Sequence, residues 1–226
     1  MKTFNGFLTE AKRPKGAVFT FGRFNPPTTG HAKLVKQLQK VAKGFDVLLF
    51  TSHSNDRRKN PLTHKQKISY LRKFFGKIVV DSTVRTVFDV ANQLQQQKYT
   101  HVRMVVGSDR IREFETLLNK YNGVKARHGF YKFESIEVVS AGERDPDADD
   151  VSGMSASKLR GYAEQGDFDN FKVGVPSKNA SDIQRLYKDI RKGMGIMEST
   201  LPDYMNEDLI TEGVYDPGIF KAVFLM

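Results

Sequence analysis

Short, continuous apolar runs alternate with segments of helical periodicity along most of the chain, and this alternation constrains the fold more than any other feature. Apolar runs without polar alternation indicate strands covered on both faces, as in a parallel sheet between two layers of helices. The predicted strands are 17–21, 46–50, 77–80, 101–106 and one within 136–140, and the predicted helices are 29–43, 63–75, 84–97, 108–121, 155–165 and 180–192. The sequence therefore predicts an α/β fold with a doubly wound parallel sheet.

The domain organisation follows from where this pattern starts and fades. We expect a leader over residues 1–15, a Rossmann-like domain over 16–175, a helical extension over 176–197, and an acidic linker over 198–226 that ends in the start of a truncated second domain. In Rossmann-like sheets, ligands bind outside the carboxyl ends of the strands, where the strand order reverses. Functional residues are therefore expected in the loops that follow strands.

The charge balance indicates what kind of partner the chain binds. Lysine and arginine total 36 against 26 aspartate and glutamate residues, which gives a net charge of +10. Such a surface favours nucleotides, phosphorylated metabolites, nucleic acid or acidic membranes, although a basic surface can also serve solubility alone. The absence of cysteine excludes disulfides, thiolate metal sites and a cysteine nucleophile. With no secretory signal and no apolar run of about 20 residues, we expect a cytoplasmic protein with no membrane partner.

The loop after the first predicted strand carries the strongest functional signal. Residues 21–34 read FGRFNPPTTGHAKL, a tight turn rich in glycine and proline that runs into a helix. This geometry directs free backbone N–H groups at an anion. Gly30 leaves room for a phosphate chain near the backbone, and His31 in the first turn could donate to a phosphate oxygen.

A second stretch, VSGMSASKLRGY at 151–162, repeats this logic. Ser155 is a plausible N-cap, Ser157 offers a hydroxyl in the first turn, and Lys158 and Arg160 add positive charge. The planar fork of an arginine suits phosphate oxygens particularly well. Either stretch alone could be an ordinary capped helix, but the two together predict a polyphosphate site at the edge of one sheet.

The two stretches together resemble the signatures of the nucleotidyltransferase superfamily. The first signature is matched at Gly22, Phe24, Pro26, Thr28, Gly30 and His31, and the second at Ser155, Ser157 and Arg160. The resemblance covers about residues 16–175 and implies transfer of a nucleoside monophosphate from ATP or CTP to a phosphorylated acceptor, with release of pyrophosphate. It implies catalytic roles for Thr28, His31 and Arg160, nucleotide contacts from Gly22, Arg23, Phe24, Gly30, Ser155 and Ser157, and Mg²⁺ held mainly by substrate phosphates rather than by protein ligands.

Further stretches bear on the nucleotide and the acceptor. The GRF-x-P turn resembles the archaeal-type nicotinamide mononucleotide adenylyltransferases more than the phosphopantetheine branch of the superfamily, and KNPLTHKQKISYL at 59–71 is similar to a stretch of the same group. A cytidylyl- or phosphopantetheine-type transferase is the alternative. VVGSDR at 105–110 is similar to a Gly-x-Asp turn that meets the ribose, which makes Gly107 and Asp109 candidate nucleotide contacts, although Asp109 could equally be a simple helix-start charge. Further candidates are Arg57, Arg58 and Lys59 for the acceptor phosphate, Lys65 or Lys67 in place of an arginine usual in the family, and, more weakly, His53.

Other readings of the sequence stay open. GMSASK also echoes a loop of class I aminoacyl-tRNA synthetases, and a non-catalytic module could keep the fold and use its basic surface, including for nucleic acid. The opening MKTFNGFLTE resembles leaders of tailed-phage proteins. FKAVFLM at 220–226 resembles the first strand of a P-loop kinase, as in bifunctional nicotinamide-nucleotide enzymes, or it adds an edge strand to a sheet.

Overall fold

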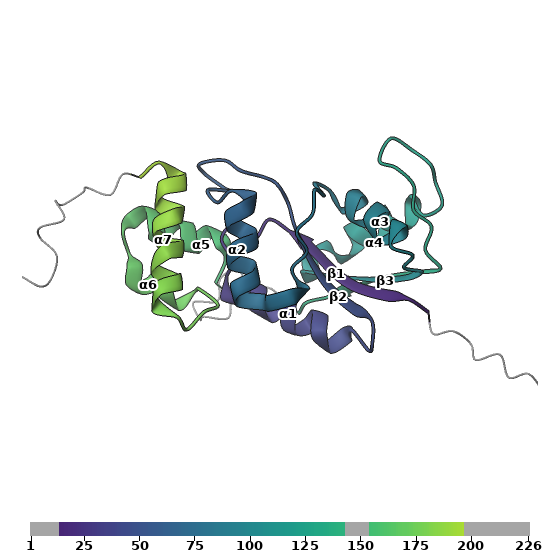
Figure 1. The fold of residues 1–226 in the computed structure, drawn as a ribbon, viewed down its shortest axis with the longest axis horizontal. Coiled ribbons are helices and arrows are strands. Elements are labelled where there is room, and N and C mark those ends of the chain that lie inside the picture. Colours follow the sequence, from purple (N-terminus) through teal and green to yellow (C-terminus); the bar gives the residue numbers. More distant parts are fainter. Residues whose placement is uncertain (1–13, 143–153, 197–226) are drawn as a thin grey trace, which may run out of the picture. The chain divides into compact units, whose positions relative to one another are not determined.

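A four-stranded parallel sheet forms the centre of the fold, which confirms the predicted α/β class (Figure 1). The computed structural model describes residues 14–142 and 154–196. The strands are β1 (Gly16–Gly22), β2 (Asp46–Thr51), β3 (His101–Val106) and β4 (Ser135–Ser140), in the order β2-β1-β3-β4. The chain proceeds from β1 to β2 on one side and then crosses to β3 on the other. The strand order therefore reverses between β1 and β3, where a doubly wound sheet binds its ligand.

Seven α-helices and two short 3-10 helices accompany the strands in the described parts of the chain. They are α1 (Thr29–Val41), α2 (His64–Phe75), η1 (Gly76–Ile78), α3 (Val87–Gln96), η2 (Ser108–Arg110), α4 (Ile111–Lys120), α5 (Ala156–Gln165), α6 (Phe168–Val173) and α7 (Ala180–Met194). The hydroxyls of Thr28, Thr63 and Thr86 each accept a hydrogen bond from the backbone N–H of the third residue of the following helix. The backbone N–H of each threonine donates one to the side chain of that same residue, which forms a capping box. These local signals explain why α1, α2 and α3 begin where they do.

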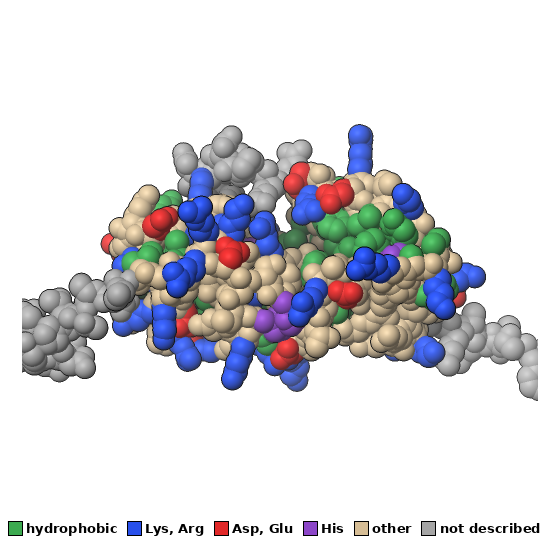
Figure 2. All heavy atoms as spheres, turned by 90° about the horizontal axis from the view of Figure 1, so that it is seen from above, with side chains coloured by type: hydrophobic (Ala, Val, Ile, Leu, Met, Phe, Trp, Pro, Cys, Tyr) green, Lys and Arg blue, Asp and Glu red, His purple; other side chains and the backbone are tan. Residues whose placement is uncertain are grey.

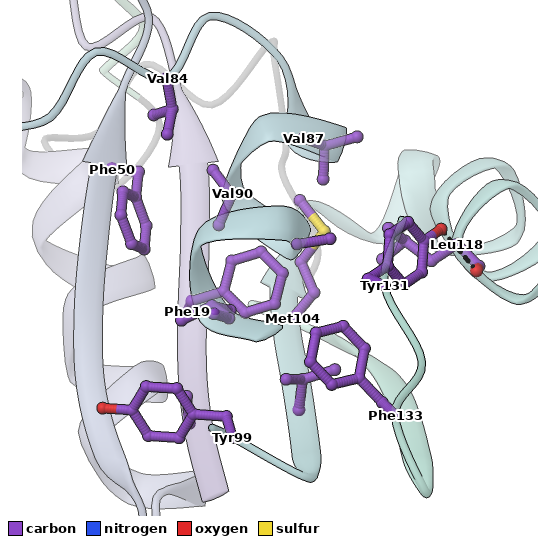
Figure 3. Packing of buried hydrophobic residues seen from close by; sticks show 14 of the residues in the cluster. Phe19, Phe50, Val84, Val87, Val90, Tyr99, Met104, Leu118, Tyr131 and Phe133 are labelled. Atoms are coloured by element: carbon purple, nitrogen blue, oxygen red, sulfur yellow. Dashed lines mark hydrogen bonds between the residues drawn. The ribbon is translucent and has the colours of Figure 1, made fainter. Parts of the chain in front are cut away.

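The two faces of the sheet are covered by different helices. Successive strand residues point to opposite faces, so Phe19 joins a cluster with residues of α3 and α4, whereas Val18 joins a cluster with residues of α1 and α2. Figure 3 shows the first of these clusters, in which the hydroxyl of Tyr131 donates to the carbonyl oxygen of Leu118 over 2.8 Å. The central strands β1 and β3 are thus buried on both sides, as their unbroken apolar runs predict, whereas the edge strand β4 is only partly covered.

A third apolar cluster joins helices α5, α6 and α7 to the outer side of α2, and these three helices lie together beyond α2 in Figure 1. Leu159 of α5, Phe171 of α6 and Leu186 of α7 are fully buried in this cluster. The Tyr70 hydroxyl of α2 donates to the Asp189 carboxylate of α7 over 2.6 Å. Helix α2 therefore links the sheet to the helices that carry the second motif.

The sequence prediction was wrong at 77–80, where no strand forms. Gly76 has a φ of +74° and ends α2, and residues 76–78 form η1 instead. Only Val79 makes a parallel bridge, to Leu49 of β2. Val79 is buried and Ile78 and Val80 are partly buried in the two clusters, without a ladder of hydrogen bonds, so apolarity alone misled the prediction.

Smaller differences concern helix bounds and faces. Helix α3 begins at Val87 rather than at 84, residues 108–110 form η2 before α4, and the six-residue helix α6 was not predicted. The apolar spacing predicts a buried face of α1 formed by Leu34, Leu38 and Val41. In the structure Val35 and Leu38 are buried, while Leu34 and Val41 are only partly buried.

Some expectations fall outside the described residues. These are the leader up to residue 13, the acidic loop at 143–153, and everything from 197 to 226, including the run that resembles a kinase strand. None of the helices described is long and apolar enough to span a bilayer.

Candidate functional site

A pocket of about 320 Å³ opens at the carboxyl ends of β1 and β3, where the strand order reverses. Its walls come from the turn after β1, the start of α1, the turn after β3, the end of β4 and the start of α5. The residues singled out from the sequence that line it are Gly22, Arg23, Phe24, Thr28, Gly30, His31, Lys59, Gly107, Asp109, Ser155, Ser157 and Arg160. Segments more than 120 residues apart in the chain therefore meet around one space.

The turn after β1 is built around a buried aromatic side chain. Phe24 has a φ of +46°, an uncommon conformation for a residue other than glycine, and it is 3% exposed. Its ring lies 4.7 Å from the imidazole of His31, centroid to centroid. A side chain at Gly22 would meet the ring of Phe24 at 3.0 Å. The glycine therefore leaves room for the ring against which His31 is held.

Thr28 and His31 form the capping box of α1. The Thr28 hydroxyl accepts from the His31 backbone N–H over 3.3 Å, and the Thr28 backbone N–H donates to Nδ1 of His31 over 3.0 Å. Because Nδ1 accepts this bond, the ring proton of the neutral imidazole sits on Nε2. The cap thus fixes the tautomer that can donate through Nε2, on a side chain that lines the pocket.

The second motif supplies the opposite wall. Ser155 caps α5 by accepting from the backbone N–H of Lys158 over 3.1 Å, and Ser157 lies in the first turn of the same helix. Arg160 donates from Nη1 to the carbonyl oxygen of Asn25 over 2.7 Å. Burial lowers the pKa of Arg160, as does nearby Arg23, and neither effect is enough to discharge a guanidinium at neutral pH.

The two motifs touch through Gly30. A side chain at this position would lie 3.1 Å from the carbonyl oxygen of Met154, the residue before the cap of α5. Such a distance is tighter than ordinary van der Waals contact. Gly30 therefore allows the starts of α1 and α5 to approach each other closely enough to share one ligand.

The pocket is strongly electropositive. Five of its lining residues are basic, namely Arg23, Lys33, Lys59, Arg110 and Arg160. Asp109 is the one carboxylate among the lining residues that the structure describes. Figure 2 shows basic side chains spread over much of one face, where acidic ones are fewer. With two helix N-termini added, the arrangement is suited to a multiply charged anion.

The turn after β3 carries Gly107 and Asp109. A side chain at Gly107 would lie 2.6 Å from a carboxylate oxygen of Asp109, so this carboxylate folds back over the glycine backbone. Arg110 follows at the rim, where it pairs with Glu113 over 2.9 Å and lies over the ring of Phe114. This end of the pocket combines one acceptor group with an aromatic surface.

Other residues singled out from the sequence lie elsewhere. Of the three basic residues at 57–59, only Lys59 lines the pocket, and the guanidinium of Arg57 lies beside Gly195 at the end of α7. Lys67 is fully buried and donates from Nζ to the carbonyl oxygens of Ser52 and Ser54, the latter over 3.4 Å. Burial lowers its pKa to about 8.

The remaining candidates at this end of the sheet are also outside the pocket lining. Lys65 is exposed on α2. His53 stacks on His64 with ring centroids 3.7 Å apart and bonds to the carbonyl oxygen of Ser82. These contacts describe a structural role for His53 in the connection between β2 and α2.

Sequence reasoning missed several lining residues, notably Asn25, Lys33, Arg110 and Phe114. Asn25 lies inside the first motif and Arg110 within the 105–110 stretch, so both belong to segments that the sequence already indicated as functional. Their contacts depend on residues far along the chain, which the local pattern does not reveal.

Strand order, pocket position and the paired helix N-termini define a Rossmann-like protein with a basic pocket at its switch point. A family model described as cytidylyltransferase-like matches residues 19–161, more than half of the chain and both motifs. The chain belongs to this family and is a nucleotidyltransferase.

The comparison with solved structures finds 40 similar chains, one of which illustrates the likeness. It is the Plasmodium falciparum nicotinic acid mononucleotide adenylyltransferase complexed with NaAD, at 15% sequence identity and a TM-score of 0.48, covering 77% of this chain and 95% of that one. The search of curated protein sequences found no match. The family assignment therefore rests on the family model and the two motifs.

Proposed function

We propose that this nucleotidyltransferase transfers AMP from ATP to nicotinamide mononucleotide and releases pyrophosphate. The observation that carries the proposal is the convergence of His31, Ser155, Ser157 and Arg160, from two helix N-termini, on one basic pocket. The choice of acceptor is supported by the likeness of the 22–31 and 59–71 stretches to nicotinamide mononucleotide adenylyltransferases. CTP is the alternative donor, since the matching family model is cytidylyltransferase-like.

In the proposed reaction, a phosphate oxygen of the acceptor attacks the α-phosphorus of the nucleotide. A new P–O bond forms there while the bond between the α-phosphorus and the bridging oxygen to the β-phosphate breaks, and pyrophosphate leaves. No covalent intermediate with the protein is needed, so the protein contributes positioning and charge stabilisation. Developing negative charge on the phosphate oxygens is met by donors that are already in place.

Each motif residue has a role that fits its contacts. His31 would donate from Nε2 to a phosphate oxygen, and Thr28 would hold that tautomer. Arg160 has one guanidinium N–H on Asn25, which leaves others for the β- and γ-phosphates beside Ser155 and Ser157. Gly22, Arg23, Phe24 and Gly30 would line the space that holds the phosphate chain. Gly107 and Asp109 would contact the nucleotide sugar.

A divalent cation fits this donor set if the phosphates supply most of its ligands. No group of three or more His, Asp or Glu side chains suited to a metal occurs within 14–142 and 154–196. Mg²⁺ commonly binds through one or two carboxylates plus substrate phosphates, and Asp109 is a carboxylate at the pocket. When bound, Mg²⁺ would neutralise charge on the phosphate chain.

The acceptor phosphate would meet Lys59, the basic residue at 57–59 that lines the pocket. Arg58 is exposed in the same loop and would act at longer range. Arg57 is a weaker candidate because it lies beside the end of α7, where a cation stabilises the helix C-terminus.

A screen for pyrophosphate release tests the proposal. ATP and CTP, each with Mg²⁺, are combined with nicotinamide mononucleotide, phosphopantetheine, glycerol 3-phosphate or choline phosphate. We expect the highest rate with ATP and nicotinamide mononucleotide, with the dinucleotide as product. A higher rate with another pair would reassign the substrates, and no release with any pair, despite saturable ATP binding, would contradict the proposed activity.

A further inference from the structure

Asn25 lies between the two halves of the pocket and is 2% exposed. Its side-chain amide forms a reciprocal pair with the backbone of Leu62, which is 37 residues away in the chain. Nδ2 donates to the Leu62 carbonyl oxygen over 2.9 Å, and Oδ1 accepts from the Leu62 N–H over 3.0 Å. One side chain therefore satisfies both backbone groups of a buried residue, as a neighbouring strand would.

The main chain of Asn25 makes a second contact, to Arg160 in the wall of the pocket. Its carbonyl oxygen accepts from Nη1 of Arg160 over 2.7 Å, the one hydrogen bond that the Arg160 side chain makes within the described residues. Asn25 thus contacts Arg160 through its backbone and Leu62 through its side chain. The two contacts can be separated by mutation, because a substitution removes only the side-chain pair.

Leu62 ends a tightly closed loop, residues 55–62, which we call the basic loop and which leads to the Thr63 cap of α2. Asp56 and Asn60 exchange backbone hydrogen bonds of 2.9 and 3.1 Å. The Asp56 carboxylate also accepts from the backbone N–H groups of Arg58 and Lys59, over 3.1 and 2.7 Å. A loop braced in this way moves as a unit, so a shift at Leu62 displaces Lys59.

We propose that Asn25 is a positioning residue whose side-chain amide fixes the basic loop, and with it Lys59, at a set place in the pocket. The proposal rests on the proposed function for the identity of the ligand that Lys59 meets. Its consequence is that the side chain and the backbone of Asn25 have different roles. The side chain of Asn25 serves the acceptor end of the pocket, and its backbone serves the end where Arg160 lies.

The test is a double-mutant cycle with Asn25→Ala and Lys59→Ala. If Asn25 acts through Lys59, Asn25→Ala raises the KM for the acceptor by about tenfold or more, since small misplacements in a site are costly. It then adds little in the Lys59→Ala background. The dissociation constant for ATP, measured by calorimetry, stays within about twofold because Arg160 keeps its backbone partner.

Asn122→Ala is a matched control. Asn122 forms the same reciprocal pair with the backbone of Phe133, over 3.0 and 2.8 Å, away from the pocket. It should lower stability to a similar degree and leave both substrate constants unchanged. Asn25→Asp, which keeps the acceptor oxygen and loses the donor, replaces Asn25→Ala if that variant does not fold, and we expect the same direction of change.

The choice of ligand in the assay distinguishes a failure of this inference from a failure of the proposed function. Where the wild type turns over an acceptor, that acceptor is used. Where it turns over none, the proposed function has failed, and the cycle is run on the binding of inorganic phosphate at saturating ATP, so that the anion probes the end of the pocket that Lys59 lines. In either case, coupling between positions 25 and 59 supports the inference. Fully additive effects, or an unchanged acceptor constant in folded Asn25→Ala protein, would overturn it.

Discussion

The backbone N–H of Thr28 donates to Nδ1 of His31 over 3.0 Å, so the cap of a helix also sets the proton position of an imidazole in the pocket. In most capping boxes the third helical residue is Glu or Gln, whose side chain only receives this bond. A histidine there accepts at one nitrogen and can donate at the other. The same contact therefore serves helix stability and the proposed chemistry.

We predict that His31→Ala lowers turnover by about 10²–10³, the usual loss for one donor to charge that develops in a transition state. ATP binding should weaken much less. His31→Ala keeps the Thr28 cap but loses the bond from the Thr28 backbone N–H to the side chain of residue 31, so Asp89→Ala, which removes the equivalent bond of α3 outside the pocket, is the matched control. The measurements are steady-state rates and calorimetric ATP binding. Wild-type turnover in His31→Ala would refute the proposed catalytic role of His31.

Arg160→Lys should reduce both nucleotide affinity and turnover although it keeps the charge. Arg160 has one N–H committed to Asn25, and a lysine cannot hold that carbonyl and a phosphate in the same fork geometry. Arg191→Lys is the comparison, since Arg191 also donates from Nη1 to a backbone carbonyl, that of Ala163, but lies outside the pocket. Equal kinetics in the two variants would show that Arg160 only braces the fold.

Gly30→Ala separates stability from activity. Alanine is the better helix former by about 1 kcal/mol, but its methyl group would meet the Met154 carbonyl at 3.1 Å and push the start of α5 away. We expect kcat/KM to fall while the free energy of unfolding changes by less than about 1 kcal/mol. Gly161→Ala, in α5 with open space around the new methyl group, should gain stability and keep full activity.

The buried amine of Lys67 should make stability depend on pH. Its pKa is lowered to about 8 in the folded protein, whereas an exposed lysine has a pKa of about 10.4. Between these values the unfolded chain binds more protons at this position, so the free energy of unfolding rises with pH, by at most about 1.4 kcal/mol per unit.

Urea titrations from about pH 7 to 9.5 measure this rise, a range that stays below the ionisation of tyrosine near 10. Lys67→Met should remove the Lys67 contribution to the slope, and Lys65→Met, on the exposed side of the same helix, should leave the slope as it is. An identical slope in wild type and Lys67→Met would contradict the assignment.

The parts of the fold that the sequence predicted are those set by local signals. Thr63 marks the start of α2, and the glycine- and proline-rich turn after β1 marks the start of α1. The run at 77–80 failed as a strand because a short apolar run reports burial and not hydrogen-bonded pairing. Helix α6 is only six residues long and carries too little periodicity to detect.

The pocket shows the same limit. The sequence motifs indicated Thr28, His31 and Arg160 because each stands in a pattern with a chemical reason. Asn25 and Lys67 were not recognised in their structural roles, since their partners, Leu62 and the carbonyl oxygens at 52 and 54, follow from tertiary packing. A lysine in an amphipathic helix is normally expected in solvent, and only the fold shows it buried.

The pocket draws its walls from helices that belong to two apolar clusters, because α1 packs in the cluster with α2 and the sheet, and α5 in the cluster with α6 and α7. A polyphosphate seated against both helix N-termini would act as a non-covalent cross-link between them. A ligand that binds only the folded state adds RT ln(1 + [L]/Kd) to the free energy of unfolding. Substrate supply would then influence how long the folded protein persists, as well as how fast it works.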